Sequence, residues 1–188
     1  NVCCDGISLE RGLSLQKKYP FVFLAAAVHP HDAEKNLSEF RNEIDQALLH
    51  KKLIALGEIG LDYYWDTNFA SEQMDALKQQ CHWALEKGLW VDIHCRKAYA
   101  DLIKTFKLPE FKELRGIIHC FSGDAREAKV LTDLGFLLGI GGVITYKNTT
   151  LFQDIKDIPL SHIVLETDAP YLSPVPFRGK PNSPKNIP

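Results

Sequence analysis

Short apolar runs alternate along this chain with longer amphipathic stretches. The runs have the length of buried strands, and the stretches between them show the i, i+3, i+4 spacing of amphipathic helices. Strands separated by helices pair in parallel, because a parallel connection needs a crossover of about a dozen residues or more. We predict about seven such units, with strands at Val2–Cys4, Phe21–Val28, Leu53–Gly57, Trp90–His94, Gly116–His119, Phe136–Ile140 and His162–Glu166.

Capping and breaking residues set the expected ends of the helices. The first helix should end at Lys18, because Tyr19 precedes a proline. In the longest helix, Ser71 is the predicted N-cap and Gly88 the predicted C-terminal stop. The predicted helices are Leu9–Lys18, Leu37–His50, Ser71–Lys87, Ala98–Phe106 and Ala125–Leu134, with a weak turn at Thr150–Ile155.

This order of elements predicts an α/β protein, a TIM-type (β/α)8 barrel that forms a single domain over residues 1–188. Such a barrel typically needs at least about 200 residues, whereas this chain has 188 and opens on an apolar run. We therefore expect the first β/α unit of the barrel to be missing from this chain. An open doubly wound sheet is the structural alternative.

Composition adds little about function. The formal net charge of −2 neither favours nor excludes nucleic acid as a partner, because a local basic patch can exist within a neutral total. The five cysteines contain no CxxC pair and suggest no disulfide framework, which indicates a reducing, cytoplasmic compartment. No apolar stretch reaches the length of a membrane span, so we expect no membrane partner.

Residues that can bind metals stand at or near the ends of four predicted strands: Glu58, His94, His119 and Asp168. The carboxyl ends of parallel barrel strands share one face, so these side chains should converge on one pocket. Imidazoles and carboxylates together are suitable ligands for a divalent metal ion. Asp168 can also take a proton from an attacking water, so the pattern predicts a metal-dependent hydrolase.

Two further segments contain residues that can support the ligands or contact the substrate. Val28-His29-Pro30-His31 contains a His-x-His pair, but Pro30 indicates a loop rather than a strand. For this segment, and for His31 in particular, we favour substrate contact or support of the ligands over direct ligation. Glu166 lies two residues before Asp168, and we interpret it as a carboxylate that supports the ligands from inside the barrel.

Other residues near these segments suit a substrate that carries phosphate. Arg96 can clamp a phosphate or carboxylate, or it can be an exposed arginine at the start of a helix. The aromatic cluster Tyr63, Tyr64 and Trp65 can stack on nucleobases or serve only for packing. Arg178 and Lys180, in the proline-rich tail, can bind phosphate or remain solvated.

With these residues in place, the sequence resembles the TatD-like metal-dependent deoxyribonucleases, within the amidohydrolase-type barrels. The resemblance runs from about Ala27 to Lys180 and rests on five motifs in the family's order: VHPHDA, GEIGLDYYW, IHCRKA, IHCFSG and ETDAPYLSP. It implies a site for two divalent metal ions (Mg, Mn or Zn) at which a metal-activated water cleaves DNA phosphodiesters, commonly as an exonuclease. Carried over, Glu58 bridges the metals, His94 and His119 hold one, and Asp168 holds the other; Asp168 and Glu58 are then the catalytic residues.

The resemblance implies DNA as the partner, as single strands or 3′ ends, and we expect the chain to act as a monomer. The family's first strand ends in a His-x-His that completes the site, and this chain shows no such strand. Two alternatives therefore stay open. One is a barrel hydrolase of a small ester, lactone or amide, and the other is a metal-binding protein without turnover.

Overall fold

The structure is a computed structural model that describes residues 1–34, 37–49, 53–64 and 67–187. The chain divides into two compact units, Asn1–Gly116 and Ile117–Pro188. Both are built from parallel strands that alternate with helices, as the hydrophobic pattern predicts. Each unit is described by itself below.

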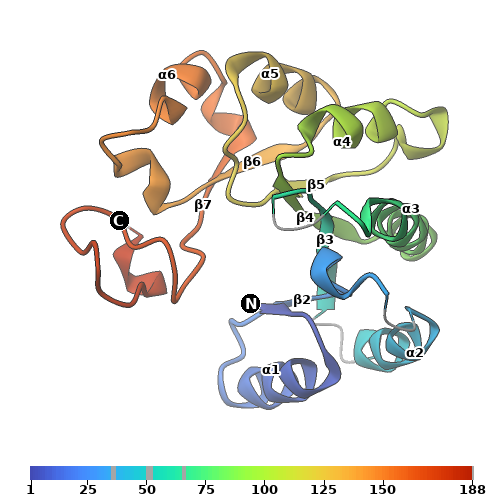
Figure 1. Cartoon of the computed structure of the whole chain (residues 1–188). Helices are drawn as coiled ribbons and strands as arrows, with labels where there is room; N and C mark the ends of the chain where they lie inside the picture. Colours follow the sequence, from blue (N-terminus) through green and yellow to red (C-terminus); the bar gives the residue numbers. More distant parts are fainter. Residues whose placement is uncertain (35–36, 50–52, 65–66, 188) are drawn as a thin grey trace. The chain divides into compact units, whose positions relative to one another are not determined.

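In the first unit, neighbouring strands pair in parallel and in the order of the sequence. Figure 1 shows the helices α1 to α3 along the outer side of the strands of this unit. Its elements are β1 (Val2–Cys3), α1 (Gly6–Lys18), β2 (Leu24–Ala26), α2 (Leu37–Leu48), β3 (Leu53–Asp62), α3 (Ala70–Lys87), β4 (Trp90–Arg96) and α4 (Tyr99–Phe106), with short 3-10 helices at Pro30–Asp32 (η1) and Pro109–Phe111 (η2).

The second unit repeats this arrangement on a smaller scale. Strand β5 (Gly116–Ile118) begins at the boundary, and β5, β6 and β7 pair in parallel in that order. The remaining elements are α5 (Ala125–Asp133), β6 (Leu137–Ile140), α6 (Leu151–Ile155) and β7 (Ile163–Leu165), with 3-10 helices at Gly142–Thr145 (η3), Leu160–His162 (η4) and Pro184–Asn186 (η5). The proline-rich tail is irregular apart from η5, as predicted.

Most predicted boundaries are confirmed to within a few residues, because prolines and glycines end helices through their own backbone preferences. Helix α1 ends at Lys18, before Tyr19-Pro20, and Gly88 ends α3 in the left-handed conformation, with φ of 64°. The predicted N-cap Ser71 is wrong: Phe69 occupies the cap position and makes no side-chain cap bond. A tertiary contact places this helix start instead, since the Gln73 side chain bonds both the N–H and the C=O of Asp62. His50, the predicted end of the second helix, lies outside the described residues.

Large apolar side chains form the interior of each unit. In the first unit the fully buried side chains include Leu56, Ile59 and Leu61 of β3, Ile93 of β4 and Leu77 of α3. In the second unit Phe121, Phe136 and Leu138 are buried in the same way. Within the described ranges, no helix is both long enough and apolar enough to cross a membrane.

Strand β3 is longer than predicted and lies unusually close to β4. It continues to Asp62, with an irregularity in the pairing between Gly57 and Ile59. Gly60 has φ of +149°, and a Cβ atom there would lie 1.9 Å from the carbonyl oxygen of His94. At Gly57 a Cβ would lie 2.3 Å from the Cβ of Asp92. Only glycine fits these two positions without a shift of the neighbouring strand.

We expect Gly60→Ala to destabilise the protein by at least about 3 kcal/mol, because it combines a glycine-only backbone conformation with a steric clash. The matched control is Gly88→Ala, also at positive φ but with no atom within 4 Å of the added Cβ. That change should cost only about 1–2 kcal/mol. Urea unfolding of both variants measures the difference, and equal losses would contradict the close approach of β3 and β4.

Candidate metal centre

Glu58 lies within β3, at the irregularity in its pairing with β4, and not beyond the strand as predicted. The strand extends past it because Gly60 and Asp62 still pair with His94 and Arg96 of β4. The pairing irregularity falls at Glu58 itself, where the backbone departs from the regular register. The close contact of the two strands therefore brings the Glu58 carboxylate beside the His94 imidazole.

His94 is held between two carboxylates. Its Nδ1 atom lies 2.8 Å from Oε1 of Glu58, and its Nε2 atom lies 2.9 Å from Oδ2 of Asp62. Both ring nitrogens can donate in this arrangement only if the imidazole is protonated. Hydrogen bonds and charge from Glu58 and Asp62 outweigh the effect of burial, so the pKa of His94 is raised. The space between Glu58 and Asp62 therefore favours a positively charged group.

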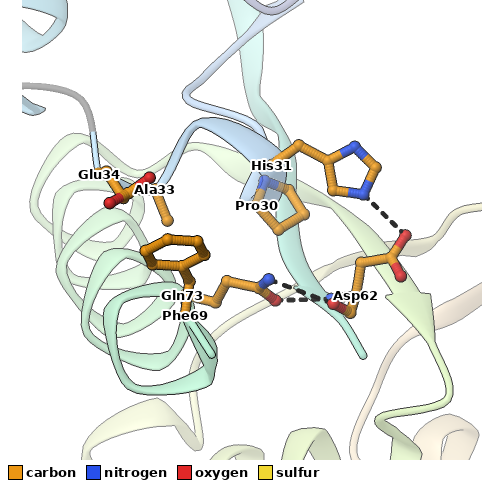
Figure 2. Close-up of a pocket in the computed structure, with 7 residues that line it drawn as sticks. All are labelled: Pro30, His31, Ala33, Glu34, Asp62, Phe69 and Gln73. Atoms are coloured by element: carbon orange, nitrogen blue, oxygen red, sulfur yellow. Dashed lines mark hydrogen bonds and ion pairs between the residues drawn. The ribbon is translucent and has the colours of Figure 1, made fainter. Parts of the chain in front are cut away.

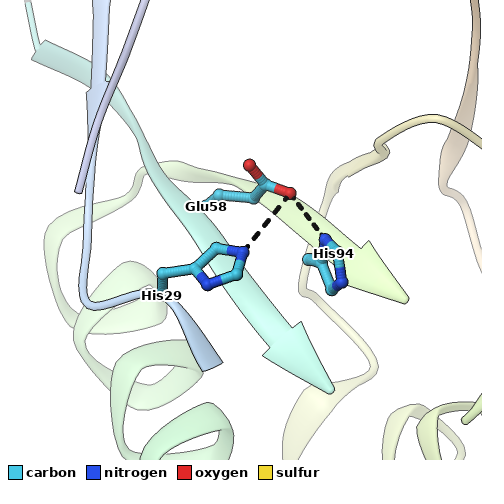
Figure 3. Close-up of side chains that lie close together, drawn as sticks. All are labelled: His29, Glu58 and His94. Carbon is cyan, nitrogen blue, oxygen red and sulfur yellow. Dashed lines mark hydrogen bonds and ion pairs between the residues drawn. The ribbon is translucent and has the colours of Figure 1, made fainter. Parts of the chain in front are cut away.

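His29 completes a cluster with Glu58 and His94. One potential ligand atom from each of these three side chains lies within 4.8 Å of the others, and Figure 3 shows both imidazoles directed toward the Glu58 carboxylate. The Nε2 atom of His29 is 3.9 Å from Oε1 of Glu58. Burial lowers the pKa of His29 to about 4, against the opposing effect of Glu58. His29 is therefore neutral near pH 7, which is the form that binds metals.

Asp62 is the residue of this centre that the sequence interpretation did not single out. Its side chain is 1% exposed, and its Oδ2 atom lies within 3.0 Å of Nε2 of His31 as well as bonding His94. Burial acts to raise the pKa of Asp62, but hydrogen bonds from the Tyr64 N–H and from His94 hold it below its usual range. Asp62 lies in the GEIGLDYY motif four residues after Glu58. Residues four apart in a strand share one face, so this spacing could have placed Asp62 beside the other ligands.

The His-x-His segment lies in a loop, as Pro30 indicated, and continues into η1. Its two histidines have different partners: His29 is part of the cluster with Glu58 and His94, whereas His31 bonds Asp62. The two imidazole rings meet edge to face, with centroids 4.6 Å apart. Sequence reasoning favoured support or substrate contact for this whole segment, but the geometry brings His29 into the position of a ligand.

Two buried glutamines of α3 hold the backbone on which this centre is built. Gln73 bonds the backbone N–H and C=O of Asp62, and Gln80 does the same for Val28, directly before His29. These glutamines are seven residues apart, which places them on one face of the helix two turns from each other. Helix α3 therefore fixes the ends of β2 and β3 relative to each other.

The donor set fits a divalent cation. Two carboxylates and the neutral imidazole of His29, largely shielded from water, leave an excess of negative charge in a small volume even while His94 is protonated. Carboxylate oxygen and imidazole nitrogen are the ligand types that divalent metal ions take from proteins. A divalent cation would replace the proton that lies between His94 and Glu58. It would also neutralise the excess negative charge of Glu58 and Asp62.

In the second unit, His119 and Asp168 are brought together with Glu166. The Nδ1 atom of His119 lies 2.9 Å from Oε2 of Glu166, and its Nε2 atom lies 3.6 Å from Oδ1 of Asp168. The other oxygen of Glu166 accepts from the Cys120 N–H at 2.7 Å. This geometry matches the supporting role expected for Glu166, because it fixes the His119 ring and directs Nε2 toward Asp168. Convergence of His119 and Asp168 with Glu58 and His94 stays a prediction.

The predicted substrate residues lie in two aromatic and basic groups. In the first unit the Arg96 guanidinium lies 3.8 Å from the centroid of the Tyr64 ring, while the Tyr63 hydroxyl bonds Asp101 at 3.3 Å. Among the described residues, Tyr64 is therefore a cation–π partner of Arg96, and the Tyr63 hydroxyl is engaged by Asp101. Trp65, the third aromatic residue of this group, lies outside the described residues.

In the second unit, Arg178 stacks on Tyr146 at 3.6 Å beside a pocket of about 250 Å³. Lys180 and the exposed Tyr171 also line this pocket, and the backbone N–H of Tyr171 bonds the carbonyl of Asp168. The described lining thus combines two cations with two aromatic rings, next in sequence to a candidate metal ligand.

Parallel strand–helix units with carboxylates and imidazoles gathered on the strands are typical of a metal-dependent α/β hydrolase. Comparison with known protein families supports this class: the model of the family "TatD related DNase" matches residues 1–188. The chain belongs to the TatD family of metal-dependent hydrolases. The TIM-type α/β fold predicted from the sequence is confirmed by this match and by a solved relative. The prediction that residues 1–188 form a single domain stays a prediction.

Three relatives define the similarity. An uncharacterized metal-dependent hydrolase, BU355 of Buchnera aphidicola, is 39% identical over 177 residues, which cover 90% of this chain and 67% of that protein. A protein of Edwardsiella piscicida named "3′-5′ ssDNA/RNA exonuclease TatD" is 34% identical over 182 residues, 95% of this chain and 70% of that protein. The crystal structure of YjjV, a TatD homologue from Escherichia coli K12, matches with a TM-score of 0.89 and 31% identity, over 98% of this chain and 72% of that one.

We expect Glu58→Gln to weaken Mn²⁺ binding by at least about 100-fold, since an amide keeps the shape of the side chain but supplies no anionic oxygen. Isothermal titration calorimetry of the wild type and the variant measures this change. His82→Ala, which removes an exposed imidazole of α3 outside the cluster, is the control and should bind as the wild type does. An unchanged affinity of Glu58→Gln for Mn²⁺ would show that this cluster is not the metal centre.

Proposed function

We propose that this chain hydrolyses phosphodiester bonds of DNA with the help of divalent metal ions, two of them in the complete site, drawn from Mg²⁺, Mn²⁺ or Zn²⁺. Its substrates are single strands or 3′ ends. The observation that carries the proposal is the cluster of His29, Glu58 and His94, with Asp62 bonded to His94, in a member of the TatD family. The name of the Edwardsiella relative supports the choice of DNA.

The chain's own residues divide the work as follows. His29, Glu58 and His94 would hold one metal position, and Asp62 orients His94 through Nε2. His119 and Asp168 would supply ligands for the other position, and Glu166 fixes the His119 ring. When bound, the metal ions lower the pKa of water from about 15.7 toward about 7 and offset the negative charge of the phosphate.

Asp168 is suited to accept the proton of the attacking water. Its side chain is more exposed than those of Glu58 or Asp62, so water can reach it. Oδ1 faces Nε2 of His119 at 3.6 Å, which leaves the other carboxylate oxygen to take a proton.

Stacked arginines supply the contacts to the DNA backbone. A guanidinium held over a tyrosine ring is restrained in position, so it loses little conformational freedom when it binds a phosphate. Arg178 on Tyr146 and Arg96 on Tyr64 both have this arrangement. Such contacts position a strand without reading its sequence, as a nuclease of broad specificity needs.

The first test is Mn²⁺- or Mg²⁺-dependent degradation of end-labelled single-stranded DNA by the wild type, Glu58→Gln and Asp168→Asn. Each substitution should lower the rate by at least about 100-fold, the scale of general-base and metal-ligand losses. Asp133→Asn removes an exposed carboxylate of α5 that pairs only with Lys129 among the described residues, and it should retain full activity. A wild type that cuts no DNA with any of these metals would refute the proposed function.

Arg178→Ala should raise KM for single-stranded DNA with little change in kcat, because the lost contact positions the backbone and not the reacting atoms. The slope of log affinity against log salt should fall by about one unit for a single phosphate contact. Lys156→Ala removes an exposed charge next to α6 and is the matched control. Equal salt slopes for Arg178→Ala and Lys156→Ala would show that Arg178 does not contact the phosphate.

A further inference from the structure

A pocket of about 370 Å³ opens beside the metal centre of the first unit. Figure 2 shows Phe69 between the Ala33–Glu34 turn and Gln73, with the His31–Asp62 pair at the other end. The same Asp62 oxygen that faces His31 also bonds His94, a member of the metal cluster. An occupant of this pocket would therefore lie one side chain away from the metal centre. The described lining residues are Pro30, His31, Ala33, Glu34, Asp62, Phe69 and Gln73.

The lining suits a flat, uncharged group. Phe69 is 38% exposed, and Pro30 and Ala33 add apolar surface near it. Gln73 has both atoms of its amide engaged by the Asp62 backbone, so it forms a rigid wall and not an adaptable partner. The described lining has two carboxylates and no lysine or arginine, so it would repel a phosphate group.

We propose that this pocket receives the nucleobase of the nucleotide whose phosphodiester lies at the metal centre, with the base stacked on Phe69. The inference rests on the proposed action on DNA and adds a base subsite to it. Every base has a π-face, so stacking on an aromatic ring holds any base without reading sequence. Stacking of this kind increases affinity by about tenfold or more.

Glu34 adds a preference among bases. An ionised carboxylate only accepts hydrogen bonds, and adenine, cytosine and guanine each present an exocyclic amino group that donates. Thymine presents carbonyl oxygens on both sides of its single N–H, and these would face the carboxylate unfavourably. The pocket therefore favours bases that carry an amino group over thymine.

The test is calorimetric titration of the metal-loaded protein with dAMP and with 2-deoxyribose 5-phosphate, which differ only in the base. The wild type should bind dAMP at least about tenfold more tightly, and Phe69→Leu, which keeps apolar volume without an aromatic face, should lose this difference. Phe69→Ala serves as the second variant. Phe21→Ala, at a ring that is 78% exposed, is the control and should keep the full difference.

Equal affinities for the two ligands in the wild type, or a difference that persists in Phe69→Leu and Phe69→Ala, would overturn the base subsite. For Glu34, the wild type should bind dAMP more tightly than dTMP, and Glu34→Gln should abolish that preference because an amide both donates and accepts. Equal binding of dTMP and dAMP by the wild type would remove the role of Glu34.

These readouts separate the two proposals, because neither nucleotide needs to be cleaved. A protein that shows Phe69-dependent binding of dAMP but degrades no DNA supports the base pocket and refutes the nuclease. A protein that degrades DNA but binds dAMP no better than the sugar phosphate refutes the base pocket and leaves the nuclease in place.

Discussion

The close contact between β3 and β4 is the constraint on which the metal centre depends. Glycines at positions 57 and 60 let the two backbones approach so closely that a side chain at either position would overlap the neighbouring strand. This approach allows Glu58 and Asp62, from one strand, to bond the two nitrogens of His94 on the next. A wider spacing would cost the buried Asp62 carboxylate its contact with His94, and burial makes a lost partner of a charged group expensive.

Helix α3 gives this centre its rigidity. Gln73 and Gln80 satisfy the backbone polar groups of Asp62 and Val28, which are buried where β3 and β2 end. The backbone of Asp62 and the backbone directly before His29 are therefore fixed by two side chains of the same helix. Catalytic and metal sites need such support, because errors of about half an ångström in ligand position already weaken them. The glutamines thus serve the site although they contact no ligand atom of the cluster.

Charge is distributed in a way that matches the proposed chemistry within each unit. In the first unit, carboxylates and imidazoles form a negative centre, and the pocket beside it has an apolar wall at Phe69. In the second unit, the pocket after Asp168 is lined by Arg178, Lys180 and two tyrosines. A nucleotide has three parts with different needs: a phosphate that requires cations, a reacting bond that requires metal ions, and a base that requires a flat apolar surface.

The sequence by itself determined the order and type of the elements and pointed to several candidate metal ligands. Apolar runs and helical periodicity reflect local burial, and Pro20 and Gly88 act through their own backbone preferences, so both can be interpreted from the chain alone. Glu58, His94, His119 and Asp168 stood out as candidate ligands because carboxylates and imidazoles suit divalent metal ions and these four lie at or near the ends of predicted strands. Only the tertiary structure decided the position of Glu58 within β3, the start of α3 at Phe69, and the roles of His29 and Asp62. These features depend on which backbone lies against which, as at Gly60 and His94 or Gln73 and Asp62, and contacts between distant segments leave no periodic signal in the sequence.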